Sequence, residues 1–154
     1  EAIIQYVKNK YNILIGEQTA EQIKIEIGSA FPLEEEMEME VRGRDLVSGI
    51  PRTIKISSEE IREALKEPVS MIVSAVRQAL EKTPPELASD IVDKGIVMTG
   101  GSSQLRGLDA LIQEKTNLAV RVADNPVECV VRGSGKVLED FPKYEKLLTT
   151  LKRE

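Results

Sequence analysis

The sequence predicts an α/β fold that carries a small α+β subdomain. Residues 2–11 and 69–80 repeat apolar side chains at helical spacing, which is the pattern of amphipathic helices. Residues 37–56 alternate apolar and charged side chains, as half-buried strands do. Residues 95–105 join a short apolar strand to a glycine pair. Together these patterns indicate a mixed sheet with flanking helices.

The composition excludes several classes of function. The chain has 154 residues, of which 41% are hydrophobic and 31% charged, as in ordinary globular proteins. The net charge of −5 and the lack of His argue against nucleic-acid binding and leave no His for catalysis or metal binding. The single cysteine, Cys129, excludes an internal disulfide, indicates a reducing compartment and is expected in the core. No apolar run approaches the ~20 residues of a membrane span, and no signal peptide is visible. The chain opens on a helical pattern without an initiator Met, which indicates a fragment.

The first 28 residues predict two helices. The first begins at Ala2 and ends near Asn12 or Gly16. The second begins at Thr19, in a segment that resembles a capping box with its acid one position early, and stops at Gly28.

Spacing also indicates how the charged residues of this region lie. Glu21 and Lys24 are three residues apart on the second helix, so spacing alone predicts an exposed ion pair. Residues 37–56 predict a small antiparallel sheet with one face in water. The acidic run of residues 34–36 is expected to be a solvated loop.

The central residues predict three helical segments in succession. Ser57 or Ser58 caps the first, and Pro68 is expected to interrupt it before a long helix resumes over residues 69–80. Thr83, Pro84 and Pro85 end that helix and start a short one.

The glycine turn is the most informative segment of the chain. Residues 95–98 predict a buried strand, and Gly100 and Gly101 let the backbone turn without a side chain that would block a ligand. Ser102 and Ser103 are candidate caps for a helix whose apolar face would contain Leu105, Leu108, Leu111 and Ile112. The pattern fits a nucleotide-binding corner, and it equally fits a tight turn in any α/β protein.

The C-terminal residues predict a strand and two helices. The strand covers residues 118–122, and a helix begins at Asn125-Pro126. Gly133 and Gly135 fall inside that helix, where close approach to a neighbouring helix or a ligand would explain them. A terminal helix is expected from Pro142 to Leu151, with Tyr144, Leu147 and Leu148 on its apolar face.

Several of these stretches, taken in order, resemble the bacterial actin homologues of the rod-shape-determining MreB/Mbl family. They are residues 19–30, 41–46, 80–88 and 95–108, followed by Asn125-Pro126 with residues 133–136. The resemblance implies an actin-like ATPase fold, with two lobes of RNase H-like topology and ATP between them. This chain resembles the C-terminal portion, the second lobe. The implied parts are an inner-subdomain helix (1–16), a small outer subdomain (17–66), and an inner subdomain with the adenosine corner and closing C-terminal helix (67–154).

The resemblance also implies a binding site for the adenosine part of ATP. In this family the helix that carries Glu21 and Lys24 faces the ribose and adenine, and the glycine turn lies against the nucleotide. The implied residues are Glu21, Gln22, Ile23, Lys24, Gly100, Gly101, Ser102, Ser103, Gln104 and Leu105. Ser102 stands where the family commonly has a third glycine. The hairpins that bind phosphate and Mg²⁺ are expected outside this chain.

The implied function is that of a cytoplasmic, membrane-associated cytoskeletal protein that forms head-to-tail filaments and maintains rod cell shape. The intact protein is expected to hydrolyse ATP slowly with Mg²⁺, whereas this chain alone should be inactive. Expected partners are further copies, the inner membrane and cell-wall elongation proteins, and no nucleic acid. An Hsp70-like or a sugar/acetate-kinase-like domain on the same superfold is the alternative.

Overall fold

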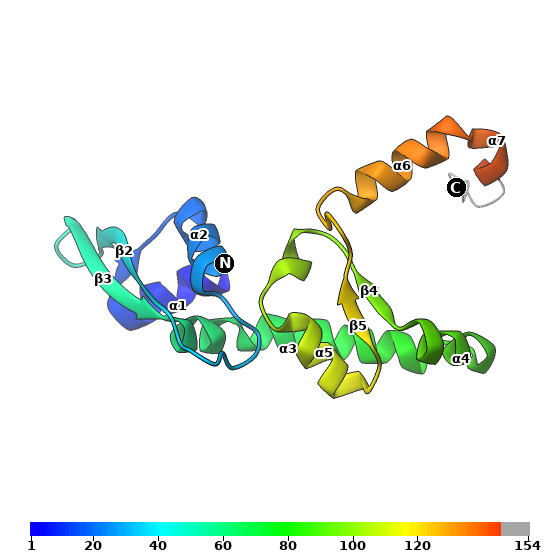
Figure 1. Ribbon diagram of the computed structural model, residues 1–154. Helices are drawn as coiled ribbons and strands as arrows, with labels where there is room; N and C mark the ends of the chain where they lie inside the picture. Colours follow the sequence, from blue (N-terminus) through cyan, green and yellow to red (C-terminus); the bar gives the residue numbers. More distant parts are fainter. Residues whose placement is uncertain (146–154) are drawn as a thin grey trace, which may run out of the picture.

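The computed structural model describes residues 1–145 as two lobes that share the long helix α3 (Ser58–Glu81), as Figure 1 shows. The N-terminal lobe contains α1 (Ala2–Tyr11), β1 (Ile13–Leu14), α2 (Glu17–Ile27), β2 (Glu38–Asp45) and β3 (Pro51–Ser57). The C-terminal lobe contains α4 (Pro85–Lys94), β4 (Ile96–Met98), the 3-10 helix η1 (Gly101–Gln104), α5 (Leu108–Thr116) and β5 (Val120–Val122). Helices α6 (Cys129–Glu139) and α7 (Phe141–Tyr144) extend away from that lobe (Figure 1). No helix within residues 1–145 is both long and apolar enough to cross a membrane.

The N-terminal lobe is built on an antiparallel sheet of strand order β1-β2-β3. Val41 lies opposite Ile54 and both are buried, whereas the charged side chains that alternate with them are exposed. The predicted small antiparallel sheet with one face in water is therefore confirmed. At Gly43 a Cβ would lie 2.3 Å from Cγ2 of Ile13, so glycine permits β1 to pair closely with β2.

The buried core lies mainly in this lobe. Its apolar members come from helices α1, α2 and α3, from the three strands and the loop after β1, and from α5 in the C-terminal lobe. They are Ile3, Val7, Ile13, Ile15, Ala20, Ile23, Ile27, Val41, Ile54, Ile56, Ile61, Leu65, Val69, Leu108 and Ile112. Helix α1 packs on β1, α2 and α3 and so belongs to the N-terminal lobe. Our division at residues 16 and 66 stays a prediction.

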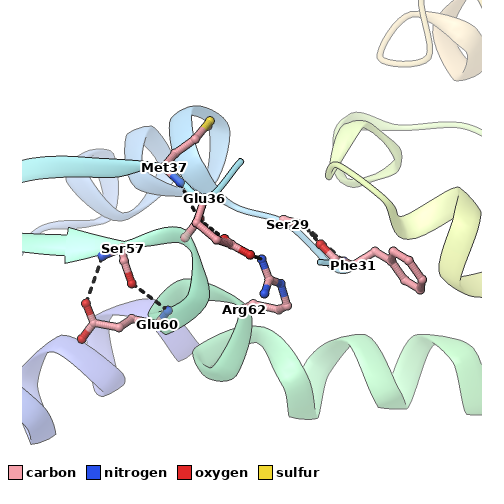
Figure 2. A network of polar contacts seen from close by, with 8 residues as sticks. Ser29, Phe31, Glu36, Met37, Ser57, Glu60 and Arg62 are labelled. Atoms are coloured by element: carbon pink, nitrogen blue, oxygen red, sulfur yellow. Dashed lines mark hydrogen bonds and ion pairs between the residues drawn. The ribbon is translucent and has the colours of Figure 1, made fainter. Parts of the chain in front are cut away.

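The segment between α2 and β2 is tied to the start of α3 (Figure 2). The buried hydroxyl of Ser58 donates to Glu36, and the Arg62 guanidinium donates to both Glu36 oxygens at 2.6 and 2.8 Å. The Ser58 hydrogen bond and then Arg62 lower the pKa of Glu36. The predicted solvated loop is therefore confirmed for residues 34–36, which are all exposed, and Glu36 in addition connects this loop to α3.

Two predicted helix boundaries in the first half are wrong. Helix α2 begins at Glu17, with Gly16 in an extended conformation as its N-cap, so Thr19 lies inside the helix. Helix α3 continues through Pro68. The loss of one backbone hydrogen bond at Pro68 is outweighed by the stripe of Ile61, Leu65 and Val69, which stays buried along the helix.

The glycine turn also differs from its prediction. Neither Ser102 nor Ser103 caps a long helix, because residues 101–104 form the short helix η1 and Leu105 is extended. Helix α5 begins at Leu108, after Gly107 with a φ of 70°. The strand before the turn is β4, which pairs in parallel with β5. It is not buried as predicted, since Val97 is 44% exposed.

The C-terminal predictions fail where they assumed burial. Asn125 has a φ of 48° and belongs to a turn, so α6 begins only at Cys129. The side chain of Cys129 is partly exposed rather than in the core, with Val130 and Val131 exposed beside it.

No described neighbour approaches the helical glycines Gly133 and Gly135, because a Cβ at either would meet nothing within 4 Å. The expected terminal helix is seen only as α7, and Leu147, Leu148 and Leu151 lie outside the described residues.

Candidate functional site

A groove of about 500 Å³ lies between α2, the middle of α3 and the glycine turn. We call it the α2–α3 groove. Six of the ten predicted site residues line it: Glu21, Lys24, Gly101, Ser102, Gln104 and Leu105. Apolar side chains form most of the remaining surface: Ile25, Leu65, Pro68, Val69, Ile72, Leu108 and Val127. Its volume is within the range of small-molecule sites, roughly 300–1,000 Å³.

Helix α2 supplies the polar wall of the groove. Lys24 Nζ donates to Glu21 Oε2 at 2.7 Å, so the ion pair expected from spacing is confirmed. Gln22, on the next face, donates to Glu26 at 2.7 Å and does not line the groove. Ile23 is fully buried in the core. Of the four predicted residues on α2, the structure thus brings Glu21 and Lys24 to the groove.

The glycine turn supplies the opposite wall of the groove. Two of its residues stabilise the turn through hydrogen bonds but do not line the groove. Gly100 has a φ of 85°, and its N–H donates to the Pro126 carbonyl at 2.7 Å. Ser103 is buried, and its hydroxyl donates to the Gly100 carbonyl at 2.6 Å. Neither lines the groove. Gly101 does, and a Cβ there would meet nothing within 4 Å.

The groove combines a polar rim with an apolar floor. Lys24 is a donor, the Glu21 carboxylate is an acceptor, and Ser102 and Gln104 can do both. A nucleoside has matching parts, since its ribose hydroxyls donate and accept and its base is flat and poorly hydrated. Within residues 1–145 no group of three or more His, Cys, Asp or Glu side chains could hold a metal ion.

Sequence analysis missed several residues of the groove. Because a helix break was expected at Pro68, the sequence did not place Pro68 and Ile72 together on one wall of a groove. Arg106 follows the predicted turn directly but was not singled out; its guanidinium donates to the Ile25 carbonyl of α2 at 2.8 Å. The sequence signal that marks Arg106 is its positive charge, one residue beyond the glycine turn.

A family model described as "MreB/Mbl protein" matches residues 1–146. The chain belongs to the MreB/Mbl family. MreB from Escherichia coli strain K12 is 58% identical over 139 residues, which are 90% of this chain and 40% of that protein. Mbl from Bacillus subtilis strain 168 is 49% identical over 144 residues, 94% of this chain and 43% of that protein. Both are described as cell shape-determining proteins, and this MreB/Mbl chain spans less than half of their length.

Solved structures confirm the predicted actin-like fold class. MreB5 of Spiroplasma citri bound to ADP matches with a TM-score of 0.87 and 39% identity, over 94% of this MreB/Mbl chain and 44% of that one. The MamK double helical filament has a TM-score of 0.74 at 20% identity, over 90% of this chain and 42% of that one, and supports the fold alone.

Proposed function

We propose that the intact protein containing this chain is a cytoskeletal ATP-binding protein that polymerises and maintains rod cell shape. In this proposal it is a slow, Mg²⁺-dependent ATPase that acts in the cytoplasm at the inner membrane with cell-wall elongation proteins. The phosphate and metal sites lie in its other half. The 58% identity to a cell shape-determining protein supports this function over the kinase-like or Hsp70-like alternative.

The α2–α3 groove is our candidate for the adenosine site. The observation that carries the proposal is that one groove joins Glu21 and Lys24 to four residues about 80 positions later in the chain, namely Gly101, Ser102, Gln104 and Leu105. Structures of MreB5 from Spiroplasma citri bound to ADP and to AMPPNP share this fold and support the assignment. Lys24 would donate to ribose or base acceptors, Glu21 would accept from ribose hydroxyls, and Leu105 would lie against the base.

Replacement of Gly101 by Val tests the assignment. No described atom lies within 4 Å of a Cβ at Gly101, and its φ is not positive, so the fold should tolerate Val. The added side chain would project into the groove, and we expect ADP affinity of the intact protein to fall by at least about tenfold, or ~1.4 kcal/mol. Calorimetric titration with ADP and with adenosine measures the effect.

Gly133→Val is the matched control, because a Cβ at Gly133 also meets nothing within 4 Å and Gly133 lies on α6, outside the groove. It should leave both affinities unchanged. Normal ADP affinity in Gly101→Val would mean that the glycine turn is structural only.

A further inference from the structure

We propose that Arg106 is a positioning residue that holds the two walls of the α2–α3 groove at a fixed separation. This inference rests on the proposed function, because it assigns Arg106 a role in the same adenosine site. Arg106 lies at the exposed rim of the groove, between η1 and α5. Arg106 positions the two walls by binding the end of α2, and not by binding the nucleotide.

The Arg106 side chain closes the C-terminal end of α2. Its Nη1 donates to the carbonyl of Ile25 at 2.8 Å and to that of Gly28 at 3.4 Å. The last carbonyls of a helix have no partner within the helix and carry partial negative charge, so a cation is favourable there. These hydrogen bonds join the C-terminal end of α2 and its C-cap Gly28 to the residue that directly follows the glycine turn.

The backbone at the same point makes a second, independent connection. The N–H of Ala30 donates to the Arg106 carbonyl at 2.8 Å, and Ser29 pairs with Arg106 in a parallel bridge. Next to it, a Cβ on Gly107 would lie 2.6 Å from Cβ of Phe31, so the two chains pass in close contact. These backbone contacts do not depend on the Arg106 side chain, and a variant at Arg106 should still fold.

The consequence concerns the separation of the two walls. Glu21 and Lys24 lie on α2, one turn and one residue before Ile25, whose carbonyl Arg106 binds. The groove-lining residues of the glycine turn end at Leu105, immediately before Arg106. The Arg106 guanidinium therefore connects the C-terminal end of α2, which forms the polar wall, to the end of the glycine turn. Without the guanidinium, the ligand would have to order the two walls when it binds. The free-energy cost of that ordering weakens binding even when every contact residue is present.

The experiment compares Arg106→Gln and Arg106→Lys in the intact protein, with ADP and adenosine as probes. Arg106→Gln should lower the affinities for ADP and for adenosine by a similar factor of about ten, because both ligands contain the adenosine part that the groove is proposed to bind. Arg106→Lys keeps the charge but can reach fewer carbonyls, and should restore part of the affinity. Arg77→Gln is the matched control, since Arg77 is exposed on α3 outside the groove.

A double-mutant cycle with Lys24→Met separates positioning from direct contact. If Arg106 acts through α2, the double variant should lose less than the product of the two single effects, because misplacement of α2 already weakens the contact of Lys24. A fully additive cycle, or unchanged ADP affinity in Arg106→Gln, would overturn the positioning role and leave the proposed function standing. Failure of the unaltered protein to bind ADP would overturn both.

Discussion

Asp45 organises the turn between β2 and β3 through its carboxylate. Oδ1 accepts hydrogen bonds from the backbone N–H groups of Val47 at 2.9 Å and Ser48 at 2.8 Å, and Oδ2 accepts one from Arg52 at 3.2 Å. The Ser48 and Val47 N–H groups, followed by Arg52, lower the pKa of Asp45 to about 2. Such an arrangement is common where an Asp begins a turn.

The lowered pKa predicts how stability responds to acid. Because the folded pKa lies below the ordinary value of 3.8, the charged carboxylate contributes its full stabilisation above about pH 4, and the contribution is lost as the pH falls through about 2. Asp45→Asn should therefore lower the Tm near neutral pH, and this difference should shrink between about pH 4 and pH 2. Thermal unfolding followed by circular dichroism at several pH values measures it.

Asp90→Asn is the control for this prediction, because Asp90 is exposed on α4. Its effect on the Tm should be small throughout. A Tm difference for Asp45→Asn that stays constant across the acid range would contradict the assigned role of the carboxylate.

At the residue scale, sequence predicted local contacts and missed distant ones. Spacing alone was enough for the pair of Glu21 and Lys24, since three residues on a helix place them together. The Arg62 partner of Glu36 is 26 positions away, and no local pattern marks it. For the same reason the contact from Arg106 to α2 was not foreseen.

At the scale of elements, the start of α3 is fixed by a capping box that also reaches α1. The Ser57 hydroxyl accepts from the Glu60 N–H at 3.3 Å, and Glu60 accepts from the Ser57 N–H at 2.9 Å. The same carboxylate accepts from the Tyr11 hydroxyl at 2.6 Å and pairs with Lys10. Burial would raise the pKa of Glu60, but the hydrogen bonds from Lys10, Tyr11 and Ser57 outweigh it and lower the pKa.

Glu60→Ala should therefore destabilise the N-terminal lobe. It removes the Glu60 side-chain half of the capping box and leaves the half-buried Tyr11 hydroxyl without its acceptor, so we expect the free energy of unfolding to fall by about 1–3 kcal/mol. Urea denaturation of the intact protein measures the change. Glu59→Ala is the control, since Glu59 is exposed in the same helical turn; an equal loss in both variants would contradict the role of the network.

Which elements form was easier to predict than where they begin and end. The cap at Ser57 and the helix start at Pro85 depend on local chemistry and are confirmed. The break at Pro68 is wrong because burial on both sides of it holds α3 together. The start of α5 was placed too early because the extended conformation of Leu105 and the positive φ of Gly107 depend on contacts with distant residues.

At the scale of the whole molecule, an apolar face predicts burial without showing what covers it. Cys129 was expected in the core, yet its apolar neighbours on α6, Val130 and Val131, are 70% and 68% exposed. This chain spans 40–43% of the length of the relatives described above. Burial of an apolar face depends on the surface that packs against it, which the pattern of the face itself does not encode.

The last prediction concerns filament assembly by the intact protein. Arg42 and Arg44 are exposed on β2, and the turn beyond them exposes Val47 and Ile50 by 87% and 63%. The Asp45 hydrogen bonds hold this turn in one conformation, so it could dock with little loss of conformational entropy. We expect the N-terminal lobe to contact the next subunit through this surface.

Charge reversal at Arg42 or Arg44 should then raise the critical concentration for polymerisation, by about tenfold if the residue faces the contact, because like charges at an interface are strongly unfavourable. Pelleting of filaments over a range of protein concentrations measures it, with Arg77→Glu on α3 as the control for the change in net charge. An unchanged critical concentration in both Arg42→Glu and Arg44→Glu would remove these residues from the interface. If only Val47→Asp then impaired assembly, the contact would be confined to the turn.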